Sequence, residues 1–408
     1  MRAPDAARMK PLLIVLGWYC PGTGFTRVLS MLTERFRARY RVRWIGVGYR
    51  GDPIELARDV ELVPTNRNGG DLLGAYALVR ELRALQPAAI FALNDVWHLA
   101  HYARVLAPHR GDARLVGYFP LDGRPLAADI VAPLHAFDVL ATYTRCARDA
   151  VRAVWPRQQA RPLLRVVGHG VDVAAFRPWP ELERSDFLAS AREEARRAAF
   201  PAWTPDESAF VVLNASRPDP RKRLDLTLEG FARFAADKPA GVRLCLHHAL
   251  GNSALARDVR ERAQAFGIAQ RLLFNDAVGT LSDDSLNTLY NACDVGLNTS
   301  AGEGFGLVSF EHAAAGAAQV LPDHAALAEL WGDHAVRVPL ARHYVPDFSP
   351  LEMAETSPAA IADALELLYR DPEHLRERSR SACTHARGPR WRWARVASGL
   401  QRLFAVSR

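Results

Sequence analysis

Lysine, paired cysteines and long apolar runs are all scarce in this sequence of 408 residues. Only three of its 52 basic residues are lysines: Lys10, Lys222 and Lys238. The five cysteines are scattered without a C-x-x-C pair, which excludes a disulfide scaffold and a zinc ribbon and favours a reduced, cytoplasmic compartment. No run approaches the roughly 20 apolar residues of a membrane span, and the first apolar stretch, residues 11–17, is too short for a secretory signal. A lysine inside a motif therefore carries weight, because a compact ammonium differs chemically from the prevailing guanidinium.

The charge balance limits the kinds of partner. The net charge is +7, with 49% hydrophobic and 24% charged residues, which fits a globular protein of two or three domains. The positive excess favours a phosphate-bearing substrate and is compatible with peripheral contact at an anionic inner membrane face. A nucleic-acid binder concentrates its charge in one tract with interleaved aromatics. Arginines are spread along this chain, so we expect no nucleic-acid partner.

Strand and helix patterns alternate along the whole chain, which predicts an α/β fold with parallel sheets. The segment 176–206 interrupts this rhythm, because it is rich in Glu, Arg and Ala between prolines. We therefore expect two facing Rossmann-like domains with a ligand cleft between them: residues 1–175, a linker or helical insertion at 176–206, and residues 207–388, with a last helix at 389–408. Expected strands include 11–16, 42–47, 88–93, 115–119, 139–142, 164–167, 210–214, 242–247, 272–274, 295–297 and 319–321; expected helices include 26–36, 72–85, 98–106, 224–235, 254–266, 286–292 and 307–315.

The first glycine loop argues against a nicotinamide enzyme. Residues 17–24 read GWYCPGTG between the first strand and the first helix. Gly22 and Gly24 fit part of a G-x-G-x-x-G fingerprint, but Arg27 stands at its third glycine position. The second strand, 42–47, is not followed by the acidic residue that would hold a ribose. A Rossmann oxidoreductase is therefore disfavoured.

A basic loop follows the strand 210–214. Arg217 and Lys222 flank a Pro-Asp-Pro turn there, at the carboxyl end of the strand. Two cations at such a position suit a diphosphate group. A solvated basic loop fits the same residues equally well.

The segment 294–322 is the most informative. It reads as a strand, a polar turn, the sequence Glu303-Gly304-Phe305-Gly306 and then a helix. Glycines let the backbone approach a ligand, and the amides at the helix start favour an anion. Glu303 and Glu311 would repel that anion, so they are expected to accept hydrogen bonds from neutral hydroxyls such as those of sugar and ribose. The spacing alone fits a glycine turn with acidic residues at a helix N-terminus equally well.

Together these segments resemble the retaining GT-B glycosyltransferases of family four, the group 1 type. Arg217 and Lys222 are similar to that family's Arg-x-x-x-x-Lys diphosphate loop, and Glu303 and Glu311 to its two glutamates separated by seven residues. Gly170-Val171-Asp172 is similar to the motif that closes the family's N-terminal domain, and Trp391-Arg392-Trp393 falls where its last, domain-crossing helix stands. The likeness covers most of the chain.

The resemblance implies a role for each matched residue. Arg217 and Lys222 would neutralise the donor diphosphate, Glu311 would bind ribose hydroxyls and Glu303 would hold hydroxyls of the donor sugar. The remaining donor contacts would come from Gly22 and Gly24, from Val278 near the base, and from the backbone amides of Phe305, Gly306 and Leu307. The family needs neither a metal nor a cofactor, because cations and the helix dipole carry the charge neutralisation.

Two departures affect the acceptor side. Thr23 separates the two glycines of the first loop, and no histidine follows the strand that ends near Phe119. Asp122 stands in that histidine's place, and it is also what an Asp-Gly β-turn would contain.

The resemblance implies transfer of a sugar from a UDP- or GDP-linked donor to a saccharide or lipid-linked acceptor, in surface polysaccharide or glycolipid synthesis. The alternatives are a GT-B nucleotide-sugar epimerase and a non-catalytic nucleotide-sugar-binding protein.

Overall fold

The computed structural model describes residues 10–65, 70–125, 127–217, 219–247, 254–274 and 281–405. The chain divides into two compact units, and it passes between them more than once. The first unit comprises Met1–Leu121, Ala127–Gly168 and Trp393–Arg408, and the second comprises Asp122–Leu126 and His169–Arg392. The domain limits expected from the sequence stay predictions, whereas the expected α/β class with parallel sheets is confirmed.

The first unit is built on an eight-stranded sheet with the order β3-β4-β2-β1-β5-β6-β8-β9. All neighbours pair in parallel except β3 and β4, which are antiparallel. The residues from Leu13 to Leu16 are fully buried, as a central parallel strand requires. The strands are β1 (Leu12–Trp18), β2 (Arg41–Val47), β3 (Ile54–Ala57), β4 (Val60–Pro64), β5 (Ala89–Leu93), β6 (Arg114–Phe119), β8 (Val139–Thr142) and β9 (Leu163–Val166).

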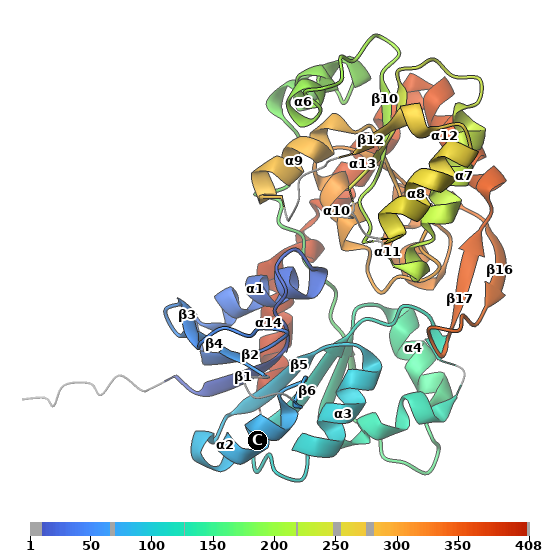
Figure 1. Ribbon diagram of the computed structural model, residues 1–408. Coiled ribbons are helices and arrows are strands. Elements are labelled where there is room, and N and C mark those ends of the chain that lie inside the picture. Colours follow the sequence, from blue (N-terminus) through green and yellow to red (C-terminus); the bar gives the residue numbers. More distant parts are fainter. Residues whose placement is uncertain are drawn as a thin grey trace, which may run out of the picture. The chain divides into compact units, whose positions relative to one another are not determined.

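Helices of the first unit come from both ends of the chain (Figure 1). The last helix, α14, packs against α1, and the ring of Phe404 lies 5.2 Å from Phe36 and 5.4 Å from Phe91. The segment 393–404 therefore completes the core of a unit whose other residues lie more than 200 positions earlier. The helices are α1 (Gly24–Phe36), α2 (Ala75–Leu85), α3 (Val96–Leu106), α4 (Arg145–Val154) and α14 (Trp393–Phe404).

The second unit has a six-stranded parallel sheet with the order β12-β11-β10-β13-β14-β15. Its helices α7 and α12 pack closely, because Gly230 leaves room for Ile361: a Cβ at Gly230 would lie 2.6 Å from Ile361 Cγ2. The strands are β10 (Phe210–Asn214), β11 (Val242–Leu246), β12 (Leu272–Phe274), β13 (Val295–Leu297), β14 (Ala318–Pro322) and β15 (Val336–Val338). The helices are α5 (Pro180–Arg184), α6 (Glu193–Ala199), α7 (Leu224–Ala235), α8 (Ala254–Ala265), α9 (Asp283–Ala292), α10 (Leu307–Ala314), α11 (Ala325–Trp331), α12 (Pro358–Arg370) and α13 (Pro372–Ala386).

A small antiparallel sheet is added to the second unit, with the order β16-β17-β7. Strands β16 (Leu340–Tyr344) and β17 (Leu351–Thr356) form a hairpin, and β7 (Arg124–Pro125) pairs with the free edge of β17. The segment with β7 is flanked in sequence by parts of the first unit but belongs to the second. This sheet was not predicted from the sequence.

Two arginines attach the segment 176–206 to the second unit. Arg192 and Arg196 are both buried, and both form ion pairs with the buried Asp294 at the start of β13. Asp294 Oδ2 also accepts the backbone N–H of Val211 at 2.7 Å, and Arg192 Nη2 donates to the Gly316 carbonyl at 2.7 Å. One carboxylate thus joins two strands of the sheet to the segment that precedes it.

Removing that carboxylate should be costly. Asp294→Ala leaves two buried guanidinium groups without a counter-charge, so we expect the free energy of unfolding to fall by about 3–5 kcal/mol. Denaturant unfolding measures the change. Arg197→Ala, which breaks the exposed pair between Arg197 and Glu193 in the same helix, is the matched control and should cost about 0.5 kcal/mol or less. Equal losses in the two variants would contradict the importance of the Asp294 cluster.

Candidate functional site

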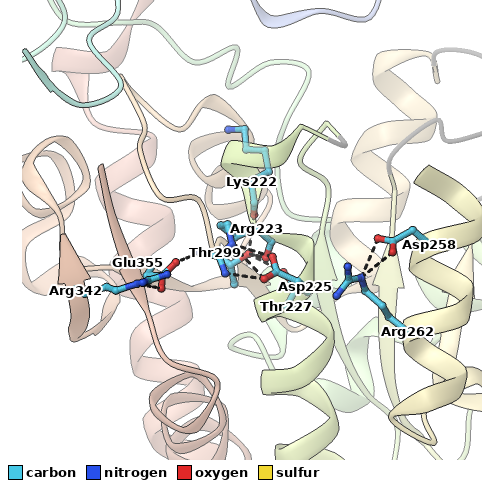
Figure 2. Close-up of polar contacts among 9 residues, drawn as sticks. All are labelled: Lys222, Arg223, Asp225, Thr227, Asp258, Arg262, Thr299, Arg342 and Glu355. Carbon is cyan, nitrogen blue, oxygen red and sulfur yellow. Dashed lines mark hydrogen bonds and ion pairs between the residues drawn. The ribbon is translucent and has the colours of Figure 1, made fainter. Parts of the chain in front are cut away.

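Two loops meet at the carboxyl edge of the second sheet, where β10 and β13 pair as neighbours. Asn214 ends β10, and its Nδ2 donates to Thr227 Oγ1 at 2.8 Å. The hydroxyls of Thr227 and Thr299 are 2.7 Å apart, and Thr299 Oγ1 donates to the Lys222 carbonyl at 2.9 Å. This buried chain of hydrogen bonds fixes the loop after β10 to the loop after β13 (Figure 2).

Lys222 ends a single helical turn, Pro220–Lys222, which Asp219 caps by accepting the Arg221 backbone N–H at 3.0 Å. The next residue, Arg223, has a φ of 49°, a left-handed conformation that non-glycine residues seldom adopt. Arg223 forms ion pairs with Asp225 at 2.7 Å and with Glu355, which also pairs with Arg342 of β16 (Figure 2). These pairs hold the turn that places Lys222 at the sheet edge.

Glu303 lies opposite Lys222, and the two side chains form a buried ion pair. The same carboxylate oxygen, Oε1, accepts from Asn298 Nδ2 at 3.3 Å and from Ser300 Oγ at 3.2 Å. The other oxygen, Oε2, lies 3.5 Å from Arg221 Nη1. The structure therefore brings Lys222 and Glu303 together, although they are 81 positions apart in the sequence.

The charge states at this site follow from the contacts. Burial alone would raise the pKa of Glu303, but the charges of Lys222 and Arg221 and the hydrogen bonds outweigh it and lower the pKa to about 2. Burial, together with the charge of Arg221, lowers the pKa of Lys222, and Glu303 opposes that shift. Glu303 is thus a permanently ionised carboxylate at neutral pH.

Asp122 is connected to the same edge by an ion pair with Arg221. Its Oδ2 is 3.4 Å from Arg221 Nε, and its backbone carbonyl packs so closely on Gly302 that a Cβ there would lie 1.9 Å from the carbonyl oxygen. Its expected role in place of a histidine stays a prediction.

The loop from Glu303 leads into α10. Gly306, with a φ of 82°, precedes the helix, and Leu307 is its first residue. The Phe305 ring is buried and stacks on Phe310 at 4.5 Å, so only the Phe305 backbone can face a ligand. Glu311 is buried within α10 and accepts from the Tyr290 hydroxyl at 3.2 Å.

The remaining expected residues are Arg217, Gly22, Gly24 and Val278. Arg217 is exposed in the loop after β10. Gly22, with a φ of 83°, and Gly24, at the start of α1, belong to the first unit, after β1. Val278 lies outside the described residues.

Four further residues of this site were not expected: Arg221, Asn298, Ser300 and His324. Asn298 and Ser300 directly follow β13, so their place at a strand's carboxyl end was a usable signal. His324 precedes α11; it is buried, and its Nε2 has no hydrogen-bond partner among the described residues. Burial lowers the pKa of His324 to about 4, against the opposing charge of Glu303, so this imidazole is neutral.

Metal-binding clusters and membrane-spanning helices are both absent from the described residues. Across the described ranges, no group of three or more His, Cys, Asp or Glu side chains could hold a metal ion. None of the helices in those ranges has both the length and the apolar character needed to cross a membrane.

Parts of this chain are similar in sequence to known glycosyltransferases. Residues 209–371 match the family model described as Glycosyl transferases group 1. A D-inositol 3-phosphate glycosyltransferase from Nocardia farcinica is 26% identical over 341 residues, which is 82% of this chain and 68% of that protein. A protein of the same name from Geodermatophilus obscurus is 30% identical over 250 residues, 60% of this chain and 51% of its own length.

Solved structures resemble the whole chain. Sucrose-phosphate synthase from Thermosynechococcus elongatus superimposes with a TM-score of 0.71 at 15% identity, over 97% of this chain and 98% of that chain. HepE from Anabaena, in complex with UDP and glucose, gives 0.67 at 17% identity, over 96% and 98%. At such identities the likeness shows the fold.

The depressed pKa of Glu303 predicts a pH-dependent contribution to stability. The ordinary value of 4.5 falls to about 2 on folding, so the ionised carboxylate stabilises the fold above about pH 4.5, and this contribution is lost as the pH falls toward 2. Relative to wild type, Glu303→Gln should lower the free energy of unfolding by about 3 kcal/mol at pH 7, and the gap should shrink below pH 4.5. Denaturant unfolding at several pH values measures it.

The exposed pair of Glu229 and Arg233 on α7 provides the control for that measurement. Glu229→Gln should change stability little at any pH. A Glu303→Gln deficit that stays constant from pH 7 to pH 2 would contradict the assigned ion pair.

Proposed function

Because residues 209–371 match the group 1 glycosyltransferase model and the chain has the GT-B fold, we propose that it transfers a sugar from a UDP- or GDP-linked donor to an acceptor hydroxyl, with retention at the anomeric carbon. The acceptor is a saccharide or lipid-linked molecule of surface polysaccharide or glycolipid synthesis. The observation that carries the proposal is the buried, ionised Glu303 paired with Lys222 at the carboxyl edge of the second sheet.

The chemistry of the edge suits a nucleoside diphosphate sugar. Lys222 and Arg217 supply positive charge for the diphosphate, and the amides of Phe305, Gly306 and Leu307 at the start of α10 add to it. Glu311 binds the ribose hydroxyls. Gly22 and Gly24, which have no side chain, let the backbone of the first loop approach the diphosphate. The complex of HepE with UDP and glucose supports a UDP-linked donor.

Glu303 acts on the sugar. As a carboxylate that stays ionised, it accepts hydrogen bonds from donor-sugar hydroxyls, and these strengthen as positive charge develops at the anomeric carbon. Lys222 and Arg217 stabilise the leaving nucleoside diphosphate, so the transfer requires no metal ion. The leaving phosphate oxygen takes the proton of the attacking hydroxyl on the same face of the sugar, which preserves the anomeric configuration.

Lys222→Ala should weaken binding of the nucleoside diphosphate but not of the nucleoside. A charge-assisted contact is worth roughly 1.5–3 kcal/mol, so Kd for UDP or GDP should rise about 10- to 150-fold. Calorimetric titration measures it. Lys238→Ala is the matched control, because Lys238 follows α7 toward the opposite end of the sheet, where it pairs with Asp237 and Glu366. Equal losses for nucleoside and diphosphate would contradict the assignment of Lys222.

Substitutions of Glu303 and Glu311 should affect different steps: one should lower turnover and the other nucleotide binding. Glu311→Ala should weaken the donor and the free nucleotide together, since it loses the ribose contact. Glu303→Gln should lower kcat strongly while UDP or GDP binds nearly as in wild type, because its contacts strengthen only in the transition state. Donor turnover and nucleotide affinity, measured on both variants, test this; wild-type turnover by Glu303→Gln would show that Glu303 does not act on the sugar.

A further inference from the structure

Neither motif assigns a role to Arg221, a further cation of this edge. It lies between Arg217 and Lys222 in sequence, and its side chain is largely buried. Its guanidinium contacts three groups: Nε lies 3.4 Å from Asp122 Oδ2, while Nη1 donates to the Gly302 carbonyl and lies 3.5 Å from Glu303 Oε2. Its backbone carbonyl accepts the Ala301 N–H at 2.8 Å. Main chain and side chain of Arg221 thus both hold the loop that carries Glu303.

We propose that Arg221 is a positioning residue, which directs the second carboxylate oxygen of Glu303 toward the hydroxyls of the donor sugar and is itself anchored by Asp122. This inference rests on the proposed function and deepens it. It gives Arg221 a task different from that of Lys222, although the two cations are adjacent in the chain.

The division of contacts on the Glu303 carboxylate supports this task. Oε1 already receives three donors, from Lys222, Asn298 and Ser300. Among the described residues, Oε2 forms an ion pair with Arg221 at 3.5 Å, which is longer than a normal hydrogen bond. Oε2 therefore keeps acceptor capacity for a hydroxyl, while the guanidinium limits the rotation of the carboxylate.

The geometry requires arginine. Separate nitrogens of one planar group reach Asp122 on one side and the Gly302–Glu303 loop on the other. A lysine ammonium is a single point charge at the end of a flexible chain and cannot span both. Only a side chain with several donors in one plane can contact Asp122 and the Gly302 carbonyl together.

Asp122 is held firmly enough to act as an anchor. Strand β7, which starts two residues later, pairs with β17, and Arg124 Nε donates to Glu352 Oε2 at 2.9 Å. A Cβ at Gly123 would lie 2.5 Å from the Glu352 carbonyl oxygen, so the backbone here lies directly against β17. Asp122 and the Gly302–Glu303 loop therefore hold the Arg221 guanidinium from two sides.

The decisive comparison is between Arg221→Ala and Arg221→Lys, each in the wild-type and the Glu303→Gln background. Turnover of UDP- and GDP-sugars gives kcat, and calorimetry gives Kd for UDP and GDP. We expect both substitutions to lower kcat by about tenfold or more with Kd changed less than about twofold, and to add less than about twofold to the loss already caused by Glu303→Gln. Asp122→Asn should also lower kcat, and combining it with Arg221→Ala should add less than about twofold to the loss caused by Arg221→Ala alone.

Two results would overturn the proposal. A rise in Kd of about tenfold in Arg221→Ala would make Arg221 a diphosphate ligand, and losses that multiply with Glu303→Gln would make it independent of that carboxylate. Melting temperatures identify a misfolded variant, and Arg221→Lys keeps the charge so that a folded comparison is available. Arg233→Ala, which breaks an exposed pair on α7, should leave kcat unchanged.

The proposed function fails separately. If wild-type protein neither binds UDP or GDP nor turns over any donor, the proposed function is wrong and the positioning role falls with it. If the wild type is active and only the pattern among the Arg221 variants differs from expectation, the positioning role alone is wrong.

Discussion

The buried ion pair between Lys222 and Glu303 determines the shape of the candidate site. Each charge is expensive to remove from water, and each is stable there only because the other is present with further hydrogen bonds around it. The two residues come from loops that follow adjacent strands, so the pair requires the register of β10 and β13 and the hydroxyl chain through Thr227 and Thr299. The ion pair and the packing of the sheet edge therefore depend on each other.

Much of this organisation follows from the sequence. Short apolar runs that alternate with helical spacing predicted the parallel strands other than β4 and β15 within a few residues, because buried parallel strands are apolar on both faces. The same alternation predicted helices α1 to α3, α7 to α10 and α14. The scarcity of lysine pointed to Lys222 as a candidate site residue. The glycine turn between two glutamates pointed to Glu303. The structure then placed these two side chains in contact.

The rest was beyond local reasoning for physical reasons. Strands β3 and β16 are largely exposed, so they lack the apolar runs that signal a strand. Arg221 looked like one more arginine in a basic loop, because its significance depends on Asp122 and Gly302, which are distant in sequence. Nothing in the sequence distinguishes His324, whose buried Nε2 has no hydrogen-bond partner among the described residues. Tertiary contacts decide all of these.

The short segment Asp122–Leu126 has a consequence for dividing the molecule into pieces. It belongs to the second unit, yet parts of the first unit precede and follow it in the chain. A recombinant fragment that starts at His169 would therefore contain Arg221 without its anchor Asp122, and β17 without its partner β7. Such a fragment would expose an unpaired strand edge, which is a template for aggregation. The second unit is a three-dimensional unit that no single continuous stretch of the sequence encodes.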